Sequence, residues 1–376
     1  MGATIAGTYS MTAAPHPILN PVRKSHVEGD YHDHEVNLAH RNHGFLLEGL
    51  RNDVTPAGMH YLLIHFDVPF VPAPDAWTLS VGGLVETPLS LKLADLAALP
   101  QITTRVTLEC AGNGRSLARP RWPSQPWHVE AVGTAEWTGT PLRHVLGRAG
   151  ITRNAQEVVF TGADRGFDAG IEHDYGRSLP VAMALSDDIL LVTAMNGQPL
   201  LPQHGAPLRL IVPGWYGMAS VKWLTRIDVI DHAYQGFQQV GTYIFKQVEG
   251  EAGVPVTTIR VKSLLVPPGI PDWYSRRRLV ERGTVPLFGR AWSGAGVPIT
   301  KVEVGIDGRF SPAELDSPAG KFAWRGWRFD WSAEPGEYEL SCRATDANGD
   351  VQPLGQRFDR AGFGNNTVHR VPVTVR

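Results

Sequence analysis

Cys110 stands in the stretch of this sequence with the clearest capacity for chemistry, Thr107-Leu-Glu-Cys-Ala-Gly-Asn-Gly-Arg-Ser116. The cysteine ends a strand-like run, and the small residues that follow it leave space for a bulky group beside the sulfur. Asn113-Gly114 favours a tight turn, and Arg115 brings a positive charge that stabilises a thiolate or a bound anion. The thiol therefore suits a nucleophile or a metal ligand. On the residue pattern alone, a structural cysteine before a turn is an equal alternative.

A second dense segment spans residues 195–223. It places His204, Arg209 and Lys222 among glycines and prolines whose loops let backbone approach a ligand. Arginine grips a phosphate with two parallel hydrogen bonds, and lysine meets it as a point charge. The segment therefore favours an anionic ligand over a solvated loop. The sequence contains no Gly-x-Gly-x-x-Gly, no Walker loop and no Gly-x-Ser-x-Gly.

The elements that must position these residues begin with a region from residue 56 to 250. Short apolar runs alternate there with turns and two helical stretches, which is typical of a mixed α+β domain. We expect helices over Leu91–Leu99 and Pro141–Ala149. The expected strands are Tyr61–Ile64, Trp77–Val81, Glu157–Thr161, Ile189–Ala194, Leu208–Val212 and Ile227–Ile230.

Residues 251–376 lack helical signals, and strands recur at short spacing, which predicts a β-sandwich. The boundary falls near Gly250–Val254, where glycines and a following proline break the pattern. In Tyr338–Ala344 every second residue is apolar, so we expect Cys342 in the sandwich core. The expected strands are Val285–Trp292, Ile299–Ile306, Trp327–Trp331, Tyr338–Ala344 and Val368–Val375.

Residues 1–55 form a polar N-terminal extension. Eight of the 14 histidines precede residue 66, namely His16, His26, His32, His34, His40, His43, His60 and His65. Their spacing is loose and includes no His-Glu-x-x-His, which favours a solvated extension that wraps the first domain over a metal site. Met1–Lys24 lacks the apolar core of a secretory signal, and no run of about 18 apolar residues occurs. We therefore expect a cytoplasmic protein without a membrane partner.

The composition excludes several classes of function. With 376 residues, 43% of them hydrophobic and 19% charged, the chain has material for two globular domains. Lys and Arg number 35 against 37 Asp and Glu, so the net charge of −2 offers no field to attract nucleic acid or anionic lipid. Cys110 and Cys342 lie too far apart in the chain to indicate a disulfide framework or a cysteine-based zinc or iron–sulfur site.

Three segments together resemble the sulfite oxidase family of molybdenum enzymes. They are Cys110-Ala-Gly-Asn with its nearby arginine, Met195-Asn-Gly-x-Pro-Leu-x-x-x-His-Gly-x-Pro-x-Arg209, and Ser220-Val-Lys-Trp-Leu224. Ala291-Trp-Ser-Gly294 also resembles the start of that family's C-terminal dimerisation domain. The likeness extends from about residue 56 to the end. It implies a sulfite-oxidase-type molybdopterin domain followed by an immunoglobulin-like β-sandwich that forms a homodimer.

The resemblance also implies roles for individual residues. Molybdenum is held by one molybdopterin and by the thiolate of Cys110. The residues that the resemblance places on the cofactor are Tyr61, His65, Cys110, Asp164, His204, Arg209, Ser220 and Lys222. Arg115 and Tyr243 orient the substrate and stabilise its charge, and Trp127 packs against the pocket and excludes water.

Three positions depart from the family pattern. Leu63 and Ile64 stand where the family has an arginine and an asparagine, and Val297 stands where it has a second substrate-binding arginine. Each lost guanidinium removes charge-assisted hydrogen bonds worth about 1.5–3 kcal/mol, which lowers affinity for a dianion about tenfold or more. The cations that compensate if they fold over the pocket are Arg119, Arg121 and Arg165.

By resemblance, the expected reaction transfers an oxygen atom to a small sulfur oxyanion, most simply sulfite to sulfate. No Cys-x-x-Cys-His haem motif occurs, so the electrons must pass to a separate acceptor. Two alternatives stay open. One is a reductase of nitrate or an S- or N-oxide on the same cofactor, and the other is a non-catalytic dimer that binds the cofactor.

Overall fold

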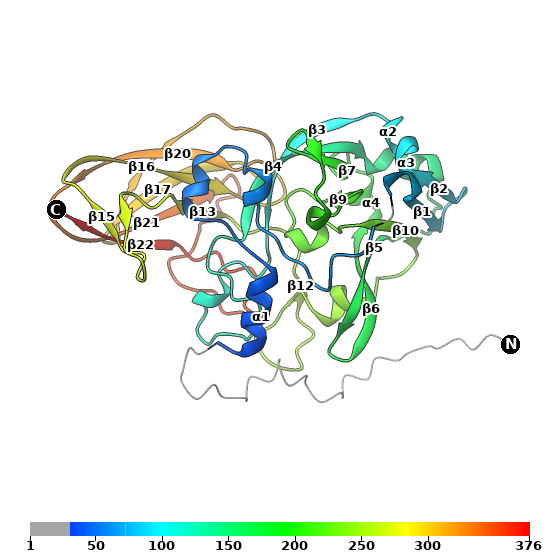
Figure 1. The fold of residues 1–376 in the computed structure, drawn as a ribbon, viewed down its shortest axis with the longest axis horizontal. Coiled ribbons are helices and arrows are strands. Elements are labelled where there is room, and N and C mark those ends of the chain that lie inside the picture. Colours follow the sequence, from blue (N-terminus) through cyan, green and yellow to red (C-terminus); the bar gives the residue numbers. More distant parts are fainter. Residues whose placement is uncertain (1–30, 72) are drawn as a thin grey trace.

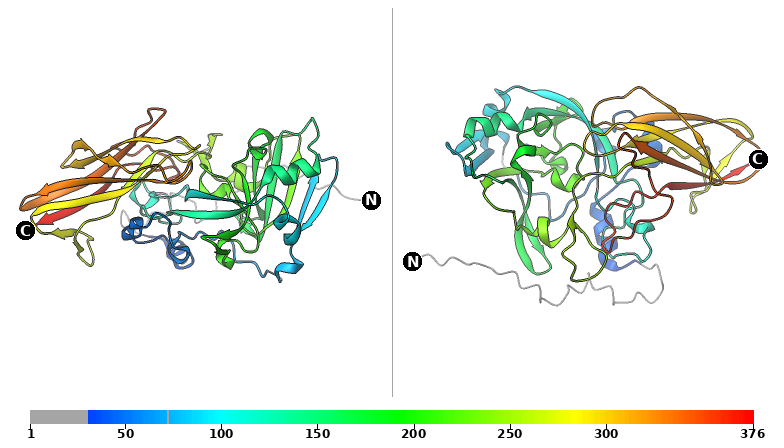
Figure 2. Two further views of the ribbon diagram at one scale, coloured as in Figure 1. Left: turned by 90° about the horizontal axis from the view of Figure 1, so that it is seen from above. Right: turned by 180° about the vertical axis from the view of Figure 1, so that it is seen from behind.

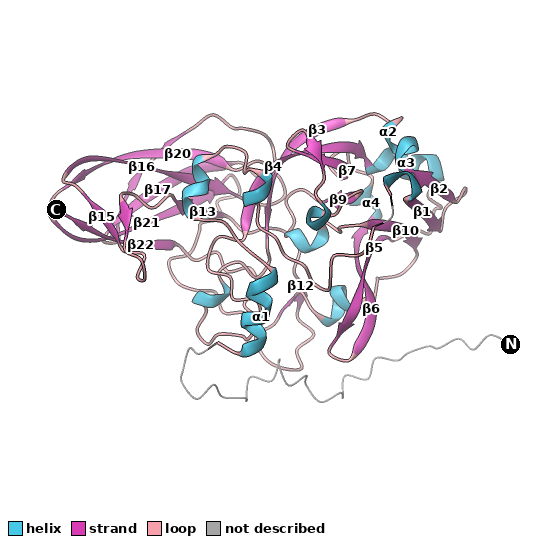
Figure 3. Ribbon diagram, viewed as in Figure 1, coloured by secondary structure: helices cyan, strands magenta, loops and turns pink. Residues whose placement is uncertain are grey.

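The computed structural model describes residues 31–71 and 73–376, and His16 and His26 of the expected extension lie outside this range. An α+β domain occupies one end of the molecule and a β-sandwich the other (Figure 1). The view from above shows the two side by side along the long axis (Figure 2). Strands far outnumber helices (Figure 3). The predicted fold class is confirmed.

The α+β domain contains two sheets. The first has the order β2-β1-β10-β5-β6, and the second has the order β3-β4-β7-β8 with β9 also paired to β7. The first sheet consists of β2 Leu89–Lys92, β1 Thr78–Gly83, β10 Leu224–Ile230, β5 Glu157–Asp168 and β6 Ile171–Pro180. The second consists of β3 Ile102–Glu109, β4 Val132–Pro141, β7 Leu190–Met195, β8 Gln198–Pro199 and β9 Arg209–Ile211. The helices are α2 Leu93–Ala97, α3 Leu142–Ala149 and α4 Val181–Ala184.

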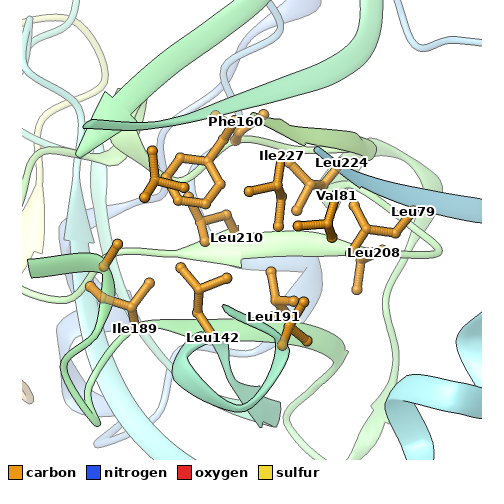
Figure 4. Close-up of a cluster of buried hydrophobic side chains, with 14 of the residues drawn as sticks. Leu79, Val81, Leu142, Phe160, Ile189, Leu191, Leu208, Leu210, Leu224 and Ile227 are labelled. Atoms are coloured by element: carbon orange, nitrogen blue, oxygen red, sulfur yellow. The ribbon is translucent and has the colours of Figure 1, made fainter. Parts of the chain in front are cut away.

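The core of this domain fills the space between its sheets and helices. Leu79 and Val81 of β1, Phe160 of β5, Leu142 of α3 and Leu191 of β7 all point into one buried apolar cluster (Figure 4). Leu79, Phe160 and Leu142 are completely buried. Because buried apolar surface is the main favourable contribution to folding, this cluster supplies the rigid support from which the loops of the domain project.

The β-sandwich pairs a four-stranded sheet with a six-stranded sheet. The smaller sheet has the order β13 Lys262–Leu265, β16 Gly283–Trp292, β20 Arg325–Ala333 and β19 Glu314–Leu315. The larger has the order β14 Ile270–Pro271, β15 Arg278–Val280, β22 His369–Val375, β21 Gly336–Asp346, β17 Ile299–Ile306 and β18 Arg309–Pro312. Cys342 is completely buried between them, as its alternating pattern predicted. The short ribbon of β11 Ile244–Phe245 and β12 Val254–Pro255 leads from one domain to the other.

Two local predictions are wrong. Tyr61–Ile64 is not a strand. Only Leu62 makes an isolated bridge, to His43, and the Ile64 N–H donates to the Asn42 side chain instead. Helix α2 is shorter than predicted because Leu89–Lys92, just before it, pairs with β1 as a strand.

The extension is also more than a solvated wrap of the first domain. Helix α1, Asp33–Arg41, is largely exposed, whereas Phe45, Leu47 and Leu50 are buried in a cluster shared by both domains. The Leu50 carbonyl accepts from Arg290 Nε of the sandwich at 2.8 Å. Residues 45–50 therefore contact both domains and help to hold them together. Among residues 31–71 and 73–376, no helix is long and apolar enough to cross a membrane.

Candidate functional site

One cavity gathers most of the predicted site residues. It encloses about 560 Å³, including the space open to solvent at its mouth. The predicted residues that line it are Tyr61, His65, Cys110, Asp164, His204, Arg209, Ser220, Lys222 and Tyr243. Arg115 and Trp127 do not line it, although both lie close enough to Cys110 to influence its thiol. The residues come from several loops and strand ends, so only the folded chain brings them together.

Cys110 occupies the loop that follows β3. Its N–H donates to the Ala131 carbonyl at 2.9 Å, and its side chain is buried at the wall of the cavity. Burial raises the pKa of the Cys110 thiol, while the charge of Arg115 acts in the opposite direction. The thiol is therefore poorly suited to act as a free nucleophile at neutral pH. A bound metal would favour loss of its proton, since metal ligation requires the thiolate.

The two glycines after Cys110 lie against neighbouring side chains. A Cβ on Gly112 would lie 2.6–2.7 Å from the guanidinium atoms of Arg115. Gly114 has φ +89°, and a Cβ there would lie 3.1 Å from the Asn365 side chain. These glycines make room for Arg115 and Asn365, while the small Ala111 lines the cavity together with Cys110. The predicted tight turn at Asn113-Gly114 is confirmed.

Arg115 is held firmly behind the cysteine. Its Nε donates to the Ala361 carbonyl at 2.8 Å and its Nη1 to the Gln125 carbonyl at 3.1 Å. Its guanidinium lies 5.2 Å from the ring centroid of Phe363. Carbonyl oxygens satisfy the hydrogen bonds of a guanidinium without neutralising it. Arg115 therefore keeps a net positive charge next to the thiol.

The β-sandwich domain supports the cysteine loop from one side. The Gly364 N–H donates to the Ala111 carbonyl at 2.7 Å, and Asn365 Nδ2 donates to the Gly114 carbonyl at 2.9 Å. Phe322 extends the edge of β3 through an isolated parallel bridge to Val106. The second domain therefore positions the loop without lining the cavity.

Glu109 and Lys262 are two residues that sequence reasoning missed. Lys262 Nζ lies 2.9 Å from Glu109 Oε1, and both side chains are at most 2% exposed. Glu109 also accepts from Asn113 Nδ2 and from the Trp292 indole, each at 2.9 Å. A fully bonded ion pair thus joins the residue before Cys110 to the sandwich. A Glu beside the cysteine and a Lys far along the chain carry no signal that they pair.

Charged and polar residues form another part of the cavity lining, called the polar wall here. Lys222 Nζ donates to the carbonyls of Leu63 and Gln203, at 2.8 and 3.2 Å. Burial lowers the pKa of Lys222, and the neighbouring Arg209 acts in the same direction. Burial raises the pKa of Asp164. An anion in the cavity would stabilise the charged forms of Lys222 and Arg209.

Several buried polar atoms of this wall have no hydrogen-bond partner among the described residues. They are Asp164 Oδ1, Arg209 Nε and His60 Nε2. Buried polar groups are normally hydrogen-bonded, and leaving one unpaired costs about 1–3 kcal/mol. The wall therefore offers a carboxylate acceptor and a guanidinium donor to a polar ligand.

Tyr243 and His65 form the remaining part of the cavity. The Tyr243 hydroxyl and His65 Nε2 share a hydrogen bond of 2.5 Å. Tyr243 has φ +52°, a left-handed conformation that is strained for an aromatic residue. Its ring stacks on Phe363 of the second domain, with centroids 5.1 Å apart. The surrounding packing thus fixes the hydroxyl in one position.

The three proposed compensating arginines do not line the cavity. Arg119 donates to the carbonyls of Ser116 and Ala118, and Arg121 pairs with Glu35. Arg165 is exposed and pairs with Glu172 and Asp174. Leu63 does line the cavity, whereas Val297 lies in the turn closed by its own N–H and the Gly294 carbonyl. The sequence had left open whether these three arginines compensate, and in the structure they do not lie at the cavity.

Three buried histidines and the half-buried His65 predict a loss of stability in mild acid. Burial lowers the pKa values of His60 and His65 to about 3, and those of His204 and His369 to about 4. Unfolded histidine titrates near 6.5. Between about pH 4 and 6.5 the unfolded chain binds more protons than the folded chain, so stability falls as the pH falls. Each histidine contributes about 1.4 kcal/mol per pH unit.

Melting temperatures measured between pH 4 and 8 test this prediction. We expect a decline below about pH 6.5, and a shallower one in the His369→Gln variant, whose site is remote from the cavity. The exposed His232→Gln variant serves as the control and should follow the wild type. A melting temperature that stays constant through this range would contradict the prediction.

Comparison with known proteins agrees with this geometry. The chain matches the family models described as the oxidoreductase molybdopterin binding domain, over residues 65–238, and the Mo-co oxidoreductase dimerisation domain, over residues 256–376. It is 33% identical to mitochondrial sulfite oxidase of Homo sapiens in an alignment over 350 residues that covers 86% of this chain and 62% of that protein. It is 34% identical to sulfite oxidase of Gallus gallus, covering 80% of this chain and 68% of that one.

Two further similarities bear on the fold and on the choice of reaction. The chain is 30% identical to a nitrate reductase of Ulva prolifera, covering 85% of this chain and 40% of that protein. The crystal structure of the sulfane dehydrogenase SoxCD from Paracoccus pantotrophus superposes with a TM-score of 0.76, at 24% identity, over 96% of this chain and 99% of that one. The chain thus spans less than two thirds of the human sulfite oxidase and less than half of the nitrate reductase.

Proposed function

Because the chain belongs to the sulfite oxidase family of molybdopterin-dependent oxidoreductases, we propose that it oxidises a small sulfur oxyanion, most simply sulfite. In the balanced reaction, sulfite and water give sulfate, two protons and two electrons, and the electrons pass to a separate acceptor. The observation that carries the proposal is the cavity itself, in which the Cys110 thiol faces the same space as a polar cationic wall and the Tyr243 hydroxyl.

The residues present fit a molybdenum–molybdopterin cofactor. Molybdopterin combines a pterin ring, rich in hydrogen-bond donors and acceptors, with a phosphate and two sulfur atoms. Among the described residues, Asp164 Oδ1 and Arg209 Nε are buried without hydrogen-bond partners, and they match such groups. Lys222 and Arg209 would hold the phosphate, with His204 and Ser220 beside them. Cys110 would supply the protein ligand to molybdenum, with Tyr61 and His65 also in contact.

The bound cofactor would supply two-electron oxygen-atom transfer, which no side chain provides. The protein's part is to hold the substrate and exclude water. Tyr243, fixed by His65 and Phe363, presents a hydroxyl to the substrate oxygens. Arg115 raises the positive potential near Cys110, and buried Trp127 packs against the cysteine from outside the cavity. Preorganised dipoles and charges of this kind lower the barrier because they need no rearrangement during the reaction.

A reductase of nitrate or of an S- or N-oxide is the second candidate. Its support is the similarity to the nitrate reductase together with Leu63 and Val297, which remove two expected substrate-binding charges. A non-catalytic dimer that binds the cofactor is the third. We further propose that the sandwich forms a homodimer, since it matches a dimerisation domain. A cytoplasmic location stays a prediction.

Metal analysis combined with turnover tests the proposed function. Protein produced in a host that makes the cofactor is analysed for molybdenum and pterin, then assayed with sulfite and ferricyanide as the electron acceptor. We expect near-stoichiometric molybdenum and steady ferricyanide reduction. Full molybdenum with nitrate or S-oxide reduction, but no sulfite oxidation, would favour the reductase. Full molybdenum without turnover of any oxyanion would favour the non-catalytic dimer.

A further inference from the structure

Arg177 on β6 is a buried cation that the predicted site did not include. Its side chain is 1% exposed, and its Nη1 donates to the Gln238 carbonyl. Its Nε and Nη2 are buried without a hydrogen-bond partner in the described part of the chain. No carboxylate of residues 31–71 or 73–376 forms an ion pair with it. Among these residues the guanidinium therefore lacks a contacting carboxylate and part of its hydrogen bonding, and Glu157 acts on it only through its more distant charge.

The position of Arg177 relates it directly to the cavity. Tyr175 lies two residues earlier on β6, so both side chains project from the same face of the strand. Tyr175 lines the cavity, and its ring lies 4.6 Å from that of His65. The Arg177 guanidinium lies 5.9 Å from the ring centroid of Tyr243, which also lines the cavity. Arg177 thus places its charge directly behind the Tyr175, Tyr243 and His65 wall.

A buried charge without a partner is costly, and a guanidinium stays protonated despite that cost. Burial lowers the pKa of Arg177, and the nearby tyrosines act in the opposite direction. The charge becomes favourable when an anion enters the adjacent space. The other cations are differently placed, since Arg209 and Lys222 line the cavity themselves, and the exposed Arg165 is neutralised by two carboxylates.

We propose that Arg177 is the residue that balances the negative charge of the substrate oxyanion at the Tyr243–His65 part of the cavity. This inference rests on the proposed oxidation of an oxyanion. It makes Arg177 a specificity-determining residue that offsets the charge lost at Leu63 and Val297. Two unit charges about 8 Å apart, in an effective dielectric of about 20, attract strongly enough to change affinity about 10- to 30-fold.

Sulfate binding to the molybdenum-loaded enzyme tests the inference without turnover. Calorimetry compares the wild type with Arg177→Met, Arg177→Lys and the control Arg165→Met, an exposed arginine on the same hairpin. We expect sulfate to bind Arg177→Met about 10- to 30-fold more weakly. Arg177→Lys keeps the charge and should stay within about threefold of the wild type, and Arg165→Met should be unchanged. Steady-state assays should show a raised KM for sulfite in Arg177→Met with kcat changed less.

Each outcome separates the inference from the proposed function. Wild-type sulfate affinity in Arg177→Met, or equal weakening in Arg177→Lys, overturns the role of the charge even if sulfite is oxidised. A wild type that binds no sulfate overturns it as well. Sulfate binding that depends on Arg177 in an enzyme that does not oxidise sulfite supports the inference and rejects sulfite as the substrate. If Arg177→Met does not fold, Arg177→Gln, which can still donate to the Gln238 carbonyl, carries the same expectation.

Discussion

The Cys110→Ala variant is expected to lose more oxyanion turnover than a variant that lacks only a hydrogen-bond partner of a metal ligand. Loss of such a partner costs roughly 10- to 100-fold. The physical reason is that Cys110 is the one cysteine on the cavity, and the other cysteine of the sequence, Cys342, is buried in the sandwich. No neighbouring thiol can take its place. Molybdenum content and turnover with sulfite and ferricyanide measure the effect.

Cys342→Ala is the matched control. Burial raises the pKa of Cys342 to about 12, so its thiol stays neutral and acts as a small apolar side chain. We expect this variant to keep molybdenum and turnover and to lose only modest stability. Melting curves confirm that Cys110→Ala is folded. A folded Cys110→Ala variant with wild-type turnover would remove Cys110 from the mechanism.

The Lys262→Met and Glu109→Gln variants are each expected to lose about 3–5 kcal/mol of stability, because each leaves a buried charge without its partner. Glu109→Gln has a second cost. Its amide NH₂ must face donors, since Asn113, Lys262 and Trp292 all donate to the present carboxylate. Chemical denaturation followed by tryptophan fluorescence measures the free energy of unfolding, and Trp292 itself lies at this contact.

Two comparisons make the test specific. The double variant Glu109→Gln/Lys262→Met should lose less stability than the two single losses combined, since neither charge is then left alone. Lys321→Met removes a pair with Asp188 that also links the two domains but is 59% and 38% exposed. Exposed pairs contribute about 0–1 kcal/mol, so this control should change little. Additive losses in the double variant would show that the two residues act independently.

The sequence determined the elements with strong periodic patterns. Helix α3 begins one residue after the predicted Pro141 and ends at the predicted Ala149, because apolar residues at helical spacing and a following glycine act locally. The sandwich strands follow from period-two burial, and Cys342 lies in the core as that alternation requires. The conspicuous residue types, a cysteine before a turn and cations among glycines, also pointed to the cavity.

Only the tertiary structure decided how those residues act. The contacts that define the site join positions far apart in the chain, such as Glu109 with Lys262 and His65 with Tyr243. No local pattern encodes such pairs, because each partner taken alone is an ordinary charged or aromatic residue. The sequence therefore directed attention to Arg119, Arg121 and Arg165, which do not line the cavity. Arg177 lies behind the cavity without an ion-pair partner in the described part of the chain, and only the packing of β6 against Tyr243 places it there. Burial and long-range pairing depend on the whole fold, and they decide which charged residues can act on a ligand in the cavity.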